Sequence, residues 1–81
     1  MFGFEYPVIS ADTVIKVRLK CNEYQREFAE RFGVTKRTVI RWEKSGAQFR
    51  RWDQRPWGPW RVLVRHYPRL FTKAEREVIR R

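Results

Sequence analysis

The sequence has little of what disulfides, metal sites and membrane spans require. Its 81 residues include one cysteine, Cys21, and one histidine, His66. A lone cysteine cannot form an internal disulfide, which suits a reducing cytosol, and a lone histidine leaves a metal site short of ligands. No apolar run approaches the ~20 residues of a membrane span, and the N-terminus lacks the basic-then-apolar layout of a signal peptide. We therefore expect a cytoplasmic protein with no membrane contact, metal or cofactor.

The arrangements of residues that catalysis needs are also missing. There is no Ser/His/Asp or Cys/His pairing and no glycine-rich loop that would hold a phosphate. Cys21 has no histidine or second cysteine near it in sequence to make it reactive, so we expect it to be partly packed. We expect no enzymatic activity and no small-molecule substrate.

Positive charge is abundant and unevenly placed. The net charge is +10, and arginine outnumbers lysine by more than two to one. Residues 1–30 hold four basic and five acidic side chains, whereas residues 31–81 hold fifteen basic and four acidic ones. A basic half of this density favours a polyanionic partner, and the arginine excess favours phosphate, because the guanidinium fork matches phosphate oxygens. The alternative is a soluble surface with surplus cations.

Residues 22–46 contain two short helical patterns that meet at one glycine. The first pattern covers 23–32, with Asn22 as the expected N-cap and Gln25 at the capping-box spacing. Gly33 follows it, and glycine is common just after a helix because it adopts a left-handed backbone at little cost. The apolar face of this helix is formed by Phe28, Ala29 and Phe32.

The second pattern covers 36–44 and has one apolar and one basic face. Thr35 is placed to cap it by accepting a hydrogen bond from a backbone N–H two or three residues on. Val39 and Trp42 point to one side and are expected to pack on Ala29. The other side carries Arg37, Arg41 and Lys44, flanked by Lys36 and Thr38. Two helices joined by a short glycine-containing turn form a helix-turn-helix unit, whose second helix enters the DNA major groove.

This stretch resembles the phage lambda-repressor/Cro type of helix-turn-helix, also called the xenobiotic-response-element type. The resemblance covers 11–46 without a gap. It rests on Gln25, Phe28-Ala29-Glu30, Gly33-Val34-Thr35, Thr38-Val39, Arg41-Trp42-Glu43 and Gly46.

The resemblance implies a role for several residues. Gln25 would contact a phosphate and help to position the recognition helix. Lys36 and Arg37 would read bases, with Arg41 one turn on. The family pairs the glutamate that follows the recognition helix with an arginine of helix one, and Glu43 and Arg18 stand at those positions.

Two positions depart from the family pattern. Tyr24 stands where a small capping residue is usual, so the first helix of the motif is expected to begin near Asn22. Ile40 is apolar where a polar surface residue is common. It would pack either on a thymine methyl or against the C-terminal part of the chain, and the residues leave both possibilities open.

The N-terminal flank is expected to add an arm and one helix. Residues 1–9 alternate in a strand-like way that Pro7 limits to an edge, so they predict an arm that packs across the domain or a partner subunit. Ser10 is a good N-cap for a helix over 11–20. Ile15 and Leu19 lie four apart in this helix and are expected to be buried.

The C-terminal part, 47–81, is basic and aromatic. Its first stretch, 47–60, reads as a turn-rich loop. Helices are expected over 60–67, with Pro59 in the first turn, and over 73–81, with a capping box from Thr72 and Glu75. The tryptophans of the chain, Trp42, Trp52, Trp57 and Trp60, favour a core role because so many exposed indoles are unusual on a soluble protein.

Together these patterns predict an all-α fold: one compact four- to five-helix helix-turn-helix domain over 1–81, with a short extended N-terminal arm. The predicted function is sequence-specific binding of double-stranded DNA by a transcriptional regulator. A small Cro-like phage or mobile-element repressor that occupies its operator as a homodimer fits best. The dimer surface is expected in the aromatic C-terminal region, helped by the arm.

The predicted contacts fall into two sets. The base-reading residues are Lys36, Arg37, Thr38 and Arg41. The phosphate-binding residues are Gln25, Thr35, Lys44, Arg50, Arg51 and Arg55. One alternative is a single-strand binder that uses the arginines and tryptophans of 47–60. Another is an inhibitor module that presents the same basic face to a host protein.

Overall fold

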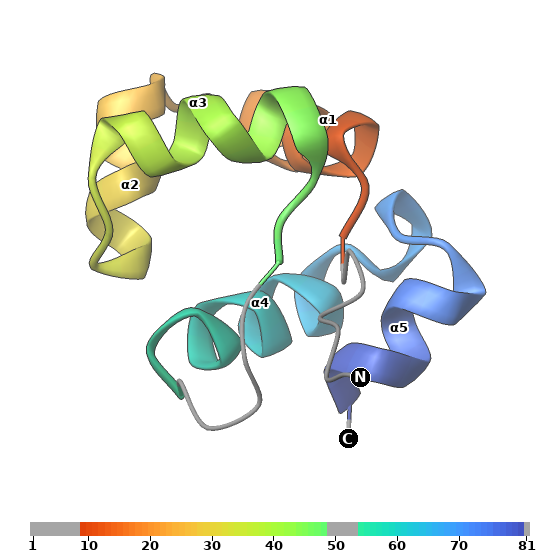
Figure 1. The fold of residues 1–81 in the computed structure, drawn as a ribbon. Helices are drawn as coiled ribbons and strands as arrows, with labels where there is room; N and C mark the ends of the chain where they lie inside the picture. Colours follow the sequence, from red (N-terminus) through yellow and green to blue (C-terminus); the bar gives the residue numbers. More distant parts are fainter. Residues whose placement is uncertain (1–8, 49–53, 81) are drawn as a thin grey trace, which may run out of the picture.

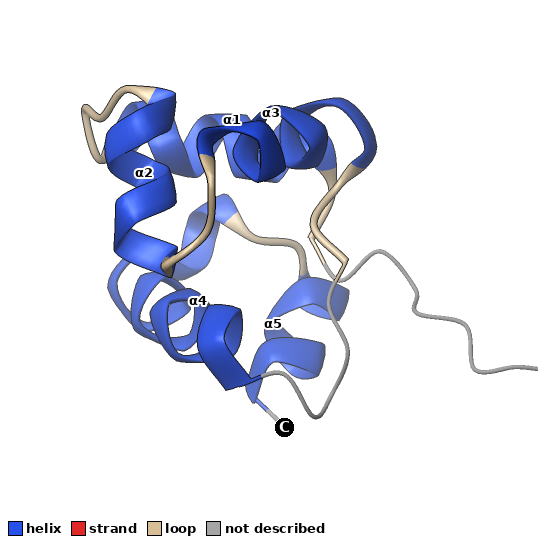
Figure 2. Cartoon of the chain, turned by 60° about the vertical axis from the view of Figure 1, so that its left-hand side comes forward, coloured by secondary structure: helices blue, strands red, loops and turns tan. Residues whose placement is uncertain are grey.

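The computed structural model describes residues 9–48 and 54–80. These residues fold into α-helices and one short 3-10 helix, joined by turns and short loops (Figures 1 and 2). The elements are α1 (Ala11–Lys20), α2 (Gln25–Phe32), α3 (Lys36–Ser45), α4 (Gln54–His66), η1 (Pro68–Leu70) and α5 (Lys73–Arg80). The all-α class and the number of helices are as predicted. None of the described helices is both long and apolar enough to cross a membrane.

α1 begins where it was predicted but buries a different face. Ser10 caps it, accepting a hydrogen bond from the N–H of Thr13 at 3.3 Å. Val14 and Val17 are fully buried, whereas Leu19 is 61% exposed, so the prediction that Ile15 and Leu19 form the buried face was wrong. The helix packs on both α3 and η1. These contacts bury Val14 and Val17 rather than Ile15 and Leu19, although the spacing of both pairs suits a helix face.

The start of α2 also differs from the prediction. The helix begins at Gln25, and Asn22 is not its N-cap, because Asn22 has φ +58°. The N–H groups of Asn22 and Glu23 bond to the carbonyls of Leu19 and Arg18, at 3.0 and 3.3 Å. This is the paired pattern of a Schellman motif, so Asn22 closes α1. Asparagine tolerates the left-handed backbone that this position requires.

The turn between α2 and α3 is built as predicted. Gly33 has φ +67°, and a second Schellman motif forms there. The N–H of Gly33 bonds to the carbonyl of Glu30 at 3.2 Å, and that of Val34 to the carbonyl of Ala29 at 3.0 Å. Thr35 then caps α3 by accepting from the N–H of Thr38 at 3.3 Å. Both ends of the turn are therefore satisfied by local hydrogen bonds.

α4 begins six residues before the predicted Trp60, so the expected loop over 47–60 is partly helical. Pro56 lies in the first turn. Backbone N–H groups there have no acceptor inside the helix, so the missing N–H of a proline removes no hydrogen bond. Pro59 lies inside the helix and removes one hydrogen bond. Trp57 and Trp60, one turn apart, are 6% and 0% exposed. Burial of two indoles offsets the cost of the proline.

The core is aromatic and joins the two halves of the molecule. Trp60 contacts the rings of Phe28, Phe32, Trp42 and Phe71, with centroid distances between 4.7 and 6.0 Å. The core role predicted for the tryptophans is confirmed for Trp42, Trp57 and Trp60, whereas Trp52 and residues 1–8 lie outside the described residues.

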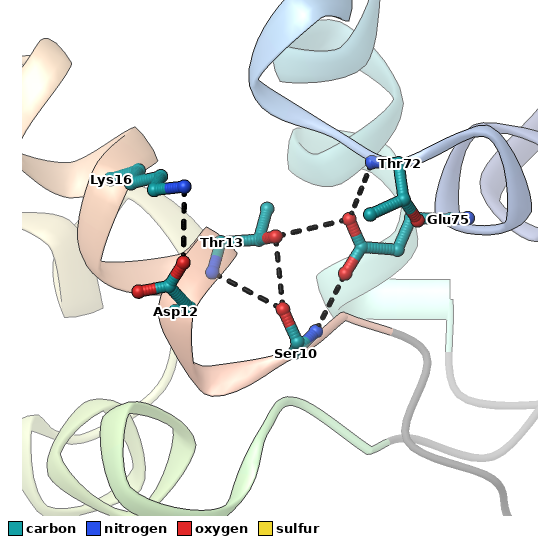
Figure 3. Close-up of polar contacts among 6 residues, drawn as sticks. All are labelled: Ser10, Asp12, Thr13, Lys16, Thr72 and Glu75. Atoms are coloured by element: carbon teal, nitrogen blue, oxygen red, sulfur yellow. Dashed lines mark hydrogen bonds and ion pairs between the residues drawn. The ribbon is translucent and has the colours of Figure 1, made fainter.

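The two chain ends of the motif are bonded to each other, and its start is also bonded to α5. Ile9 and Ala47 are fully buried and exchange backbone hydrogen bonds of 3.2 and 2.7 Å. The capping box of α5 forms as predicted: the N–H of Thr72 donates to Oε1 of Glu75 at 2.8 Å, and the N–H of Glu75 to Oγ1 of Thr72 at 3.2 Å. Figure 3 shows that the same carboxylate also reaches the start of α1.

Candidate nucleic-acid interface

α3 presents a row of cations on its outer face. In both views of the chain α3 and α5 lie at opposite ends of the molecule, and α3 packs on α1 and α2 (Figures 1 and 2). Its inner side is anchored by Val39 and Trp42, which are 0% and 3% exposed. The exposed outer residues include Lys36, Arg37, Arg41 and Lys44. Among the described residues, none of these four cations forms an ion pair.

The inner side of α3 is fixed by a polar network that joins three helices. Nε of Arg18 donates to Oε2 of Glu43 at 2.5 Å, and Nε2 of Gln25 donates to Oε1 of Glu43 at 3.0 Å. A further bond, from Nη1 of Arg18 to the carbonyl of Glu23, measures 3.0 Å. The side chains of Arg18 and Glu43 are only 16% and 10% exposed. The predicted Arg18–Glu43 contact is therefore confirmed.

The network also explains why a carboxylate lies near the end of α3. A negative charge near a helix C-terminus is unfavourable, because the unpaired carbonyls there carry partial negative charge. The guanidinium of Arg18 and the amide of Gln25 compensate for it. As a result α1, α2 and α3 are held in one arrangement, and the outer face of α3 keeps a defined orientation.

A hollow lies between the N-terminal ends of α2 and α3. Its volume is about 540 Å³, and it is lined by Arg18, Tyr24, Gln25, Arg26 and Lys36. The starts of both helices carry partial positive charge from free N–H groups. Gln25, the predicted phosphate ligand, lines this hollow while its amide nitrogen holds Glu43. Arg26 was not singled out from the sequence, although its position next to Gln25 in the first turn was the available signal.

Thr35 and Thr38 lie at the edge of the cationic row. Their hydroxyl oxygens are 3.2 Å apart, and Thr38 is half-buried. Both hydroxyls therefore take part in the cap of α3, a role that the sequence predicted for Thr35 alone. The assignments of Thr38 to base reading and of Thr35 to phosphate binding stay predictions.

Three predicted phosphate ligands are not placed by the structure. Arg50 and Arg51 lie outside the described residues, and of Arg55 only the backbone, in α4, is described. Trp57, from the same stretch, is buried, and the guanidinium carbon of Arg61 lies 5.7 Å from the centroid of its ring. This indole is therefore not a free stacking surface.

Two further groups near α2 have internal roles. Arg31 bonds to Glu23 through Nη2 at 2.6 Å, and this hydrogen bond raises the pKa of Arg31. Burial raises the pKa of the half-buried Cys21 thiol, so the thiolate is disfavoured and the predicted packing role is supported. Within the described residues no three His, Cys, Asp or Glu side chains gather as a metal site would require.

No protein-family model, curated protein sequence or solved structure matches this chain. The resemblance of 11–46 to the lambda-repressor/Cro type of helix-turn-helix stays a prediction.

Proposed function

We propose that the protein binds double-stranded DNA through α3 and regulates transcription by occupying an operator. The observation that carries the proposal is the contrast between the two sides of α3. Its inner side is fixed by Trp42 and by the Arg18–Glu43 pair, while its outer side carries four cations without an ion-pair partner among the described residues. A fixed helix with free donors is suited to reading base edges.

The dimensions and chemistry of the major groove support this assignment. The groove is about 12 Å wide and admits one α-helix. Arg37 and Arg41 are exposed one turn apart on α3, and an arginine can donate two hydrogen bonds to guanine. Lys44 follows Arg41 by three residues, and Lys36 at the start of α3 lines the hollow together with Arg26. Phosphates of the groove walls would bind at these cations.

We further propose that the protein is a small repressor of the Cro kind that acts as a homodimer on a palindromic site. Half-sites of such dimers lie about 34 Å apart, one helical turn of DNA. The buried indoles of Trp57 and Trp60 are not available for a dimer surface. Among the described residues of the C-terminal region, one large apolar residue is exposed: Val62 on α4, at 49%. A dimer surface in this region would include it.

The single-strand alternative has less support. Stacking on bases requires exposed aromatic rings, and Trp57 and Trp60 lie in the core. The inhibitor alternative uses the basic Arg/Trp face, of which Arg50, Arg51 and Trp52 lie outside the described residues. Such a function would survive the loss of DNA binding, so experiment can separate the two.

The test is selection from random duplex and single-stranded oligonucleotide pools at two salt concentrations. We expect a duplex motif, and Arg37→Ala or Arg41→Ala should weaken binding to it by about 1–3 kcal/mol. Arg65→Ala is the matched control, because Arg65 is also an exposed arginine but belongs to α4. Salt-sensitive binding without a motif in either pool would overturn base reading and leave a general polyanion contact.

A further inference from the structure

One residue on the outer face of α3 is not a cation. Ile40 follows Lys36 by four residues and Arg37 by three, so it lies on the same face as both. Its side chain is 38% exposed, and it is not part of the buried core. Of the two positions that the sequence left open for Ile40, packing against the C-terminal part is not seen among the described residues, because Ile40 belongs neither to the core nor to the residues packed on it.

Neither helix stability nor solubility explains this isoleucine. A β-branched residue is a weaker helix former than Lys, Arg or Glu at an exposed helix position. The four neighbours that the helix places one turn away are all charged: Lys36, Arg37, Glu43 and Lys44. A single exposed apolar residue is common on proteins. Here it lies in the middle of the surface assigned to the DNA.

We propose that Ile40 reads a thymine by packing on its C5-methyl group, so that the operator half-site carries a thymine beside the bases contacted by Arg37 and Arg41. The inference rests on the proposed DNA-binding function. The thymine methyl is the apolar group that a T·A pair presents in the major groove. Hydrogen-bond donors such as Lys and Arg recognise guanine acceptors, and an aliphatic side chain complements the methyl.

The helix geometry places the thymine within a narrow window. Arg37 and Arg41 are four residues apart, which corresponds to about 6 Å along the helix axis. Ile40 lies between them along that axis. All three side chains therefore reach a stretch of about three base pairs, with one base pair every 3.4 Å.

The test replaces thymine by deoxyuridine at each position of the selected duplex, which removes the methyl group and keeps the base pairing. One methyl contact corresponds to about a fourfold change in Kd. For the wild-type protein we expect a loss of about this size at one thymine in each half-site. Ile40→Ala should bind the thymine and deoxyuridine duplexes equally, and Ile40→Val, which retains a branched methyl group, should remain sensitive.

Two controls accompany the experiment. Leu19→Ala removes an exposed apolar side chain from α1 and should leave the discrimination unchanged. The thermal melt of Ile40→Ala should match that of the wild type, because the side chain lies outside the core and alanine favours the helix.

The outcomes separate this inference from the proposed function. A selected duplex motif that is insensitive to deoxyuridine, or equally sensitive in wild type and Ile40→Ala, overturns the role of Ile40 and leaves DNA binding by α3 intact. Failure to select any duplex motif overturns both.

Discussion

The arginines of α3 and two arginines of the C-terminal half have different surroundings. On the outer face of α3, Arg37 and Arg41 form no ion pair among the described residues. In the C-terminal half, Nε of Arg61 donates to the carbonyl of Ile79 at 3.3 Å, and Nη1 of Arg76 donates to the carbonyl of Phe71 at 2.8 Å. The net charge of +10 therefore does not describe one binding surface. Some arginines close the ends of helices and others remain available for a partner.

Two carboxylates with little exposure, one half-buried and one buried, show a parallel contrast. Glu43 is held by the guanidinium of Arg18, whereas Glu75, 7% exposed, accepts only from uncharged donors in the described chain (Figure 3). Oε2 of Glu75 accepts from the N–H of Ser10 at 2.8 Å, and Oε1 accepts from Oγ1 of Thr13 at 3.1 Å and from the N–H of Thr72. Because Ser10 and Thr72 begin α1 and α5, the positive ends of two helices stabilise this charge.

The largest effect is expected from Glu75→Ala. The substitution leaves two backbone N–H groups and one hydroxyl without their acceptor, so the free energy of unfolding should fall by about 3 kcal/mol. Denaturant unfolding measures the change. Glu77→Ala, an exposed residue of the same helix, is the control and should cost less than about 0.5 kcal/mol. Equal losses in the two variants would contradict the role of Glu75 as a link between α1 and α5.

A smaller loss is expected from breaking the charged network of the motif. Arg18→Met leaves Glu43 with only Gln25 as a partner at 10% side-chain exposure, and we expect a loss of about 2 kcal/mol in stability. Adding Glu43→Leu should restore part of it, because the unpaired charge is then removed. Arg31→Met breaks a more exposed pair and should cost less than about 1 kcal/mol. A double variant no more stable than Arg18→Met would argue against the charge as the cause.

Two glycines, one in each half, should respond differently to alanine. Apart from its chain neighbours, a Cβ atom would meet nothing within 4 Å at Gly33 or Gly58. Gly33 has φ +67°, and alanine there should destabilise the protein by about 1 kcal/mol. Gly58 lies within α4, where the helix propensity of alanine is opposed by the clash of its Cβ with the ring of Pro59, so alanine there should change stability by less than about 0.5 kcal/mol. Thermal melts of both variants check the pair, and a loss at Gly33 no larger than the change at Gly58 would refute this account of the turn.

The smallest effect on stability should come from the cations of α3. Arg41→Ala should change the free energy of unfolding by less than about 0.5 kcal/mol, and its effect should appear in DNA binding. Arg76→Ala removes bonds to the carbonyls of Phe71 and Pro68 and should cost about 1 kcal/mol of stability without changing DNA affinity. The two variants should be compared by unfolding and by titration with the selected duplex. Loss of DNA affinity in Arg76→Ala would remove the distinction between structural and available arginines.

Local patterns predicted much of the motif. The capping of α1 by Ser10 and of α3 by Thr35 was predicted, as was the left-handed Gly33. The buried side of α3 and the outward direction of Arg37 also followed from the sequence. The contact of Arg18 with Glu43 came from the family resemblance. Helical periodicity therefore correctly predicted that the described cations of the candidate site, Lys36, Arg37, Arg41 and Lys44, are exposed on α3.

Errors arose where two local solutions were equally good. α1 offers a valine stripe and an Ile15–Leu19 stripe, and packing on α3 and η1 chose the valines. Asn22 suits a helix start and a helix end alike, and the chain uses it to end α1. The prolines of 54–60 predicted a loop, but burial of Trp57 and Trp60 made the segment helical.

The sequence by itself determined the class of fold, the turn at Gly33 and the basic outer side of α3, because caps, glycine conformation and helical periodicity act within a few residues. Only the tertiary structure decided which stripe of α1 is buried, where α4 begins, and that Glu75 joins residues 62 and 65 positions away in the chain. It also decided that Ile40 remains outside the core. These outcomes depend on burial and on hydrogen bonds between distant segments, which exist only once the helices have packed together.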